Sequence, residues 1–150
     1  MKPHVTWILV ADGGQAKIFE HRGPGKGLVA VEGLQFEEEH LQARDIMADR
    51  PGRSFSSFGP GSRSAMEYSS DPVAVRERRF VETIAHLLDK KLQVHAFERL
   101  IIAAAPTALG DIRPALTPAV REVVMAELPK DLTNLPSPQL ERHFAALLPL

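Results

Sequence analysis

Residues 5–11, with the sequence VTWILVA, are apolar at both alternating sets of positions and run directly into an Asp-Gly-Gly turn signal. Successive side chains of a β-strand point to opposite faces of the sheet, so a strand that is apolar at both sets is covered on both faces. In an antiparallel sheet with one solvent-exposed face, by contrast, the strands are apolar on one side only. The segment therefore predicts a central strand of an α/β domain, with helices packed on the sheet.

The turn signal itself, Asp12-Gly13-Gly14, predicts a β-hairpin with strands over residues 4–11 and 15–21. Tight primed turns need φ > 0 at their central positions, and glycine adopts this conformation at little steric cost. We therefore expect Gly13 or Gly14 to have a positive φ. We expect Asp12 to act as a turn residue whose side chain bonds its own backbone.

The remaining hydrophobic patterns predict an α/β domain in the order β-β-β-α-β-α-β-α, with a mixed five-stranded sheet and helices on both faces. Three antiparallel strands should come first, and the fully apolar strand after the long helix should pair in parallel with the first strand, because a helix crosses over before it. Arg121 and Glu122 suggest that the fifth strand lies at an edge. The later elements are expected as strands over residues 28–33, 99–105 and 120–126, and as helices from Asp71-Pro72 to about 92, over 107–116 and over 138–148.

Between the third strand and the long helix the periodicity fails. A short helix over 41–48 is followed by a Gly-, Ser- and Arg-rich segment at about 50–70. Structureless loops of this length inside a domain are usually functional or disordered, so we expect this one to be mobile without a partner.

The segment also carries charge and aromatic side chains. Six arginines against three acidic residues give residues 50–80 a net charge of +3, whereas the whole chain has −1. Arginine neutralises phosphate, and exposed aromatic rings stack on unpaired bases. The alternative is a solvated loop whose rings fold back onto the core. The candidate residues for binding RNA or a partner are Arg50, Arg53, Phe55, Phe58, Arg63, Tyr68, Arg76 and Arg79.

Composition excludes several kinds of site. The 150 residues suit a single domain with one core. The chain has no cysteine, which excludes disulfides, zinc–thiolate sites, iron–sulfur clusters and a cysteine nucleophile. No apolar run approaches the roughly 20 residues of a membrane helix. We therefore expect a cytoplasmic protein that has no cofactor and does not enter a membrane.

Three segments resemble a family that is named for bacterial attachment to host cells. They read LVADGGQAKIF at residues 9–19, LIIAAAPTALGDIRPAL at 100–116 and ELPKDLTNLPSPQL at 127–140. The match covers the whole chain in the right order. The architecture is also similar to the middle domain of eukaryotic and archaeal peptide-chain release factors, which implies a ribonuclease-H-like fold. The family name describes a phenotype, so the resemblance implies little about molecular action.

Release factors use a Gly-Gly-Gln tripeptide to assist hydrolysis of peptidyl-tRNA, and this chain contains Gly13-Gly14-Gln15. In release factors, however, the tripeptide lies at the tip of the long loop before the long helix. The equivalent loop here, residues 51–70, contains no glutamine. Catalysis of this kind depends on reach as well as on residue type. We therefore interpret both glycines as turn residues and Gln15 as the start of the second strand.

Asp12 also stands where ribonuclease-H-like nucleases place their first metal-binding carboxylate. Two-metal catalysis needs further carboxylates that converge on it. The strand over 99–105 ends in Ala-Ala-Ala and is followed by Pro106, and Asp111 is expected to lie too far along the next helix. The six histidines form no i, i+4 pair of the kind that binds metal on a helix. The sequence therefore predicts no metal site.

These patterns favour a non-enzymatic module that binds RNA, the ribosome or a protein partner. The alternative is a hydrolase, either a metal-dependent nuclease or an enzyme like a peptidyl-tRNA hydrolase. Manganese-dependent stabilisation that needs Asp12, or an activity that needs Gln15, would distinguish the alternative from the binding module.

Overall fold

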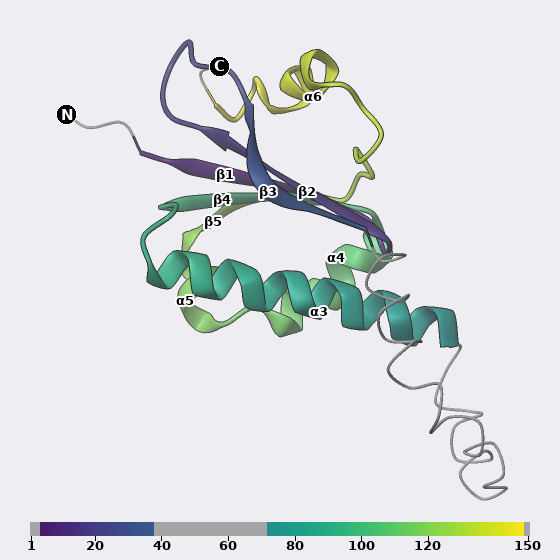
Figure 1. Cartoon of the computed structure of the whole chain (residues 1–150). Coiled ribbons are helices and arrows are strands. Elements are labelled where there is room, and N and C mark those ends of the chain that lie inside the picture. The colour runs from purple at the N-terminus through teal and green to yellow at the C-terminus, as the bar shows by residue number, and fades with distance from the viewer. Residues whose placement is uncertain (1–3, 38–71, 149–150) are drawn as a thin grey trace, which may run out of the picture.

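The computed structural model describes residues 4–37 and 72–148. It contains one mixed sheet with the strand order β3-β2-β1-β4-β5. Figure 1 shows α3, α4 and α5 on one face of the sheet and α6 on the other. This confirms the predicted α/β class, the five strands and the helices on both faces. The strands are β1 (Thr6–Ala11), β2 (Gln15–His21), β3 (Val29–Glu37), β4 (Arg99–Ala104) and β5 (Val124–Leu128), and the helices are α3 (Pro72–Gln93), α4 (Pro106–Ile112), the 3-10 turn η1 (Arg113–Ala115), α5 (Pro118–Val123) and α6 (Ser137–Phe144).

The first strand is the centre of the sheet, as predicted. β1 pairs antiparallel with β2, with Ala11 opposite Ala16, and parallel with β4, with Ala11 opposite Ala104. Every residue of β1 is buried. β2 also pairs antiparallel with β3, which confirms the predicted meander.

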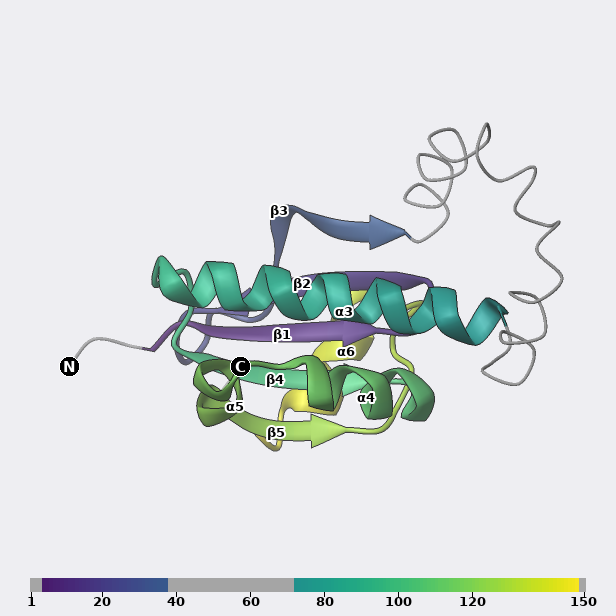
Figure 2. The ribbon, with the colours of Figure 1, turned by 90° about the horizontal axis from the view of Figure 1, so that it is seen from below.

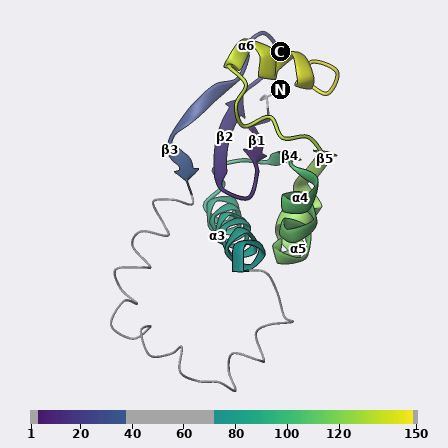
Figure 3. The same ribbon diagram turned by 90° about the vertical axis from the view of Figure 1, so that its right-hand side faces the viewer.

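The two faces of β1 enter two separate hydrophobic clusters, which explains why both sets of alternating residues are apolar. Figure 3 shows helix α3 on one side of the sheet and α6 on the other. On one face Trp7 and Leu9 belong to the cluster that contains the buried residues of α3. On the other face Ile8 belongs to the cluster that contains Leu140 and Phe144 of α6. The apolar residues of β1 therefore pack against helices on both faces of the sheet.

The strand predicted over 120–126 is wrong in its first half. The chain forms helix α5 there, and β5 starts only at Val124. Pro118 occupies the first turn of α5, and the Thr117 hydroxyl accepts the N–H of Val120 at 3.3 Å. A capping threonine followed by proline is a helix start signal, and it outweighs the strand preference of the valines. β5 is an edge strand as expected, although Arg121 and Glu122 lie in α5.

The third strand, β3, is longer than the strand predicted over 28–33, and it is bent (Figure 2). Its pairing with β2 is interrupted, because Lys17 faces Gln35 whereas Phe19 faces Ala30. Gly33 lies in this interruption with a φ of 80°. Glycine adopts this left-handed conformation without the strain that a side chain adds, so Gly33 lets β3 bulge and continue to Glu37.

The long helix α3 extends beyond the ends of the strands at its first residues (Figures 1 and 2). None of residues 72–79 is buried, and the first buried residue is Phe80. The apolar side chain of Val73 is 46% exposed. In the described parts of the chain, no helix has the length and apolar character needed to cross a membrane. The helix predicted over 41–48, the loop at about 50–70 and Asp71 at the predicted start of the long helix lie outside the described residues.

Candidate functional site

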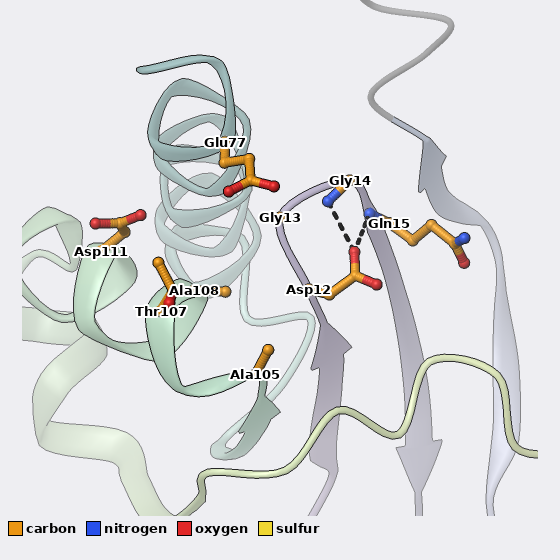
Figure 4. A pocket seen from close by; sticks show the side chains of 9 residues that line it. All are labelled: Asp12, Gly13, Gly14, Gln15, Glu77, Ala105, Thr107, Ala108 and Asp111. Carbon is orange, nitrogen blue, oxygen red and sulfur yellow. Dashed lines mark hydrogen bonds between the residues drawn. The ribbon is translucent and has the colours of Figure 1, made fainter. Parts of the chain in front are cut away.

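A pocket of about 500 Å³ lies where the carboxyl ends of β1 and β4 meet helices α3 and α4 (Figure 4). In open α/β sheets, ligands bind outside the carboxyl ends of the strands. The position therefore makes this pocket the first candidate for a binding site. It is lined by Asp12, Gly13, Gly14, Gln15, Glu77, Ala105, Thr107, Ala108 and Asp111.

Asp12 organises the hairpin, as predicted. Its Oδ1 accepts the backbone N–H groups of Gly14 and Gln15, both at 2.7 Å. The Asp12 backbone N–H donates to the carbonyl of Gln15 at 2.9 Å. One carboxylate oxygen thus satisfies two amides of the turn, which is the local bonding expected of an aspartate in this position.

The expectation that Gly13 or Gly14 has a positive φ is wrong. Among the described residues, the glycines with positive φ are Gly23, Gly25, Gly27 and Gly33. The Asp12 carboxylate closes the turn without a left-handed residue, so the hairpin does not need one.

Gly13 meets a different requirement, which is space for a side chain of α3. A Cβ atom at Gly13 would lie 2.6 Å from the carboxyl carbon of Glu77. The absence of a side chain lets Glu77 lie directly over the hairpin (Figure 4). Gly13 therefore leaves room for the Glu77 carboxylate of the crossover helix α3 at the carboxyl end of β1.

The hairpin is also tied to the segment after β5. The hydroxyl of Thr133, a residue with no solvent exposure, lies 3.2 Å from Oδ2 of Asp12 and 2.6 Å from Oδ1 of Asp131. Lys17 donates from Nζ to the Thr133 carbonyl at 3.0 Å. The single hydroxyl proton of Thr133 is thus shared between the Asp131 and Asp12 carboxylates, and the shorter distance is to Asp131. The sequence interpretation gave Thr133 no role, although the Lys-Asp-Leu-Thr motif carried part of the family resemblance.

Gln15 is the first residue of β2, as predicted. Its backbone N–H donates to Asp12, and its side chain points away from Glu77 and Asp111 (Figure 4). The Gly-Gly-Gln tripeptide is therefore built into the start of a hairpin strand.

Asp111 was expected to lie too far along α4 to approach Asp12, yet both residues line the pocket. Figure 4 shows Glu77 and Asp111 on the helix side, with the Asp12 carboxylate turned toward β2. Within residues 4–37 and 72–148, no three His, Cys, Asp or Glu side chains are grouped so that they could hold a metal ion. Sequence reasoning gave Glu77 and Thr107 no role, because their approach depends on how α3 and α4 pack.

Of the predicted binding residues, Arg76 and Arg79 lie in the described part of the chain, on the exposed start of α3. They are three residues apart, so they lie on neighbouring parts of one helix face. Arg78, between them, lies 3.9 Å from Glu82 in an ion pair. Within the described residues, neither Arg76 nor Arg79 makes an ion pair. The other candidates, Arg50, Arg53, Phe55, Phe58, Arg63 and Tyr68, lie outside the described residues.

Comparison with known proteins supports the family resemblance. The family described as "Protein required for attachment to host cells" matches residues 7–144, which span the fold from β1 to α6. No curated protein matches the chain. The chain therefore belongs to the family of proteins required for attachment to host cells.

Proposed function

We propose that this protein is a non-enzymatic binding module that contacts RNA, free or in the ribosome, through the exposed start of α3. The observation that carries the proposal is that residues 72–79, about two helical turns, have no buried residue and present Arg76 and Arg79 to solvent. Both side chains are exposed, and within the described residues neither makes an ion pair. An exposed surface with unpaired arginines suits a polyanion.

The physical basis is the release of counterions. Each arginine that neutralises a phosphate frees condensed cations, which favours binding at low salt and makes the affinity depend on salt. The sequence from residue 50 to residue 80 has a net charge of +3, so the start of α3 continues a basic stretch of the chain. The proposal extends to Arg50, Arg53 and Arg63 on the basis of this charge pattern.

The hydrolase alternative has less support. A nuclease of the ribonuclease-H-like kind would need the Asp12 carboxylate to face a metal ion together with other carboxylates. Here Oδ1 of Asp12 accepts two backbone amides and Oδ2 lies 3.2 Å from the Thr133 hydroxyl. These contacts suit a residue that holds the hairpin together.

We also propose that the domain has the ribonuclease-H-like fold of the release-factor middle domain. The support is its element order, in which three antiparallel strands precede a long crossover helix and two parallel strands. Superposition of an experimental structure on such a domain would test this part of the proposal.

RNA binding can be tested by fluorescence anisotropy with a labelled single-stranded RNA of about ten nucleotides. The test variant is Arg76→Ser with Arg79→Ser. The matched control is Lys26→Ser with Arg142→Ser, which removes two exposed charges from the loop after β2 and from α6. We expect the test variant to bind on the order of tenfold more weakly at about 50 mM salt, and the control to bind as the wild type does.

Two results would contradict the proposal. One is a wild-type protein that does not bind RNA, and the other is an equal loss of affinity in both double variants. Either result would make a protein partner the function to test next.

A further inference from the structure

We propose that the pocket at the carboxyl ends of β1 and β4 holds an unpaired guanine base of the bound RNA. This inference rests on the proposed function, because it names the part of the RNA that the domain recognises. Glu77 lines the pocket and directly follows Arg76 in the sequence, so the pocket lies next to the arginines of α3.

The size and walls of the pocket suit a flat base. Its volume of about 500 Å³ lies within the range of about 300–1,000 Å³ that is usual for small-molecule sites. Gly13 and Gly14 contribute backbone without side chains, and Ala105 and Ala108 contribute only methyl groups (Figure 4). Small apolar walls leave a slot in which a ring can lie.

The polar groups of the pocket select hydrogen-bond donors. Ionised carboxylates only accept hydrogen bonds. Within the described residues, Glu77 and Asp111 make no ion pair and no side-chain hydrogen bond, so their oxygens are available to a ligand. A ligand for this pocket therefore needs N–H groups on the edge that enters it.

Guanine meets this requirement best among the four bases. Its Watson–Crick edge presents the N1–H and N2–H₂ donors side by side, which matches the two oxygens of one carboxylate. Adenine and cytosine present a single amino group beside a ring-nitrogen acceptor. Uracil presents one N–H between two carbonyl oxygens, which a carboxylate repels. Sequence-specific RNA recognition commonly reads such edges on unpaired bases.

The charges around the pocket fix the orientation of the nucleotide. Glu77 and Asp111 repel a phosphate, so the base and not the backbone enters the pocket. Arg76 precedes Glu77 by one residue and lies about 100° around the helix from it. The arginine face can therefore hold the phosphates while the adjacent carboxylates hold the base.

The test uses the full chain and four labelled oligouridines that differ only in the central nucleotide, which is guanosine, adenosine, cytidine or uridine. We expect the guanosine oligonucleotide to bind about tenfold more tightly than the all-uridine one, since a bidentate base contact discriminates by roughly this factor. Because one carboxylate accepts both donors, at least one of the variants Asp111→Asn and Glu77→Gln should lose this preference, and neither should bind oligouridine more weakly. Glu122→Gln, an exposed carboxylate on α5 outside the pocket, should keep both.

The outcomes separate this inference from the proposed function. If the wild type binds all four oligonucleotides equally, or if both pocket variants keep the preference, the guanine site is wrong and the RNA-binding proposal stands. If no oligonucleotide binds, both proposals are wrong. The wild-type series decides the question even if one pocket variant does not fold.

Discussion

The hydroxyl oxygen of Thr133 lies 3.2 Å from Oδ2 of Asp12, although 121 residues separate the two in the chain. Asp12 directly follows the first strand, and Thr133 follows the last strand. Their contact fastens the C-terminal segment to the opening hairpin beside the pocket. Because Asp12 also holds the turn amides, the contact fixes the position of Gly13 beneath Glu77.

Replacing Thr133 with valine should destabilise the protein by about 1–3 kcal/mol. Valine keeps the shape of the buried side chain but removes the hydroxyl, which leaves Asp12 Oδ2 and Asp131 Oδ1 without this donor. Thr133→Ser keeps the hydroxyl and is the matched control. Denaturant unfolding can be followed by the fluorescence of Trp7, the one tryptophan, which is buried and stacked on Phe97. An unchanged unfolding free energy in Thr133→Val would show that the contact does not hold the segment.

Alanine substitutions at Gly33 and Gly13 should have different costs. Gly33 has a φ of 80° with open space around it, so Gly33→Ala strains the backbone and should cost about 1–2 kcal/mol. Gly13→Ala should cost less than about 0.5 kcal/mol, because the flexible Glu77 side chain can move aside. Thermal melts of the two variants make the comparison. A larger loss at Gly13 would mean that Glu77 has no room to move.

The stability contribution of Glu98 should depend on pH. The N–H of Val5 donates to Glu98 Oε1 at 2.9 Å and, together with His4, holds the pKa of this carboxyl below its ordinary value of 4.5. A carboxyl whose pKa is lower in the folded state stabilises the fold above its unfolded pKa, and this contribution disappears as pH falls through the folded pKa. The stability difference between wild type and Glu98→Gln should therefore shrink as the pH falls from about 6 through the lowered pKa of the folded state. A difference that grows on acidification would contradict this assignment.

Manganese should leave the melting temperature unchanged if Asp12 serves only the hairpin. A ligand at 100 times its dissociation constant stabilises a protein by about 2.7 kcal/mol, which a thermal melt detects easily. The comparison uses wild type and Asp12→Asn with and without the metal. A clear manganese-dependent rise that disappears in Asp12→Asn would support the nuclease alternative.

The sheet was the part of the fold most accessible from the sequence. Because β1 is apolar on both of its faces, it is buried only at the centre of a sheet that is covered on both sides. The second strand, β2, begins and ends at the predicted residues. The region after Thr117 was misread because valines favour strands, while the capping contact between Thr117 and Val120 starts a helix. A local signal of one threonine and one proline decided this segment.

The pocket could not be assembled from the sequence in the same way. Asp12 and its turn were predictable from local chemistry, whereas Glu77, Asp111 and Thr133 reach the same end of the sheet through crossovers and loops. The packing of α3 on the sheet places Glu77 against Gly13. No short-range sequence pattern predicts this contact. The sequence therefore led us to expect a positive φ at Gly13 or Gly14, whereas the role of Gly13 is to leave space for Glu77.

The salt dependence of RNA binding tests the central claim most directly. A plot of log affinity against log salt concentration has a negative slope. For single-stranded nucleic acid, this slope becomes less steep by about 0.7 for each phosphate contact that is lost. Arg76→Ser with Arg79→Ser should therefore flatten the wild-type slope by about 1.4, whereas Lys26→Ser with Arg142→Ser should leave it unchanged. Equal slopes in the wild type and the α3 variant would show that the start of α3 does not contact the RNA backbone.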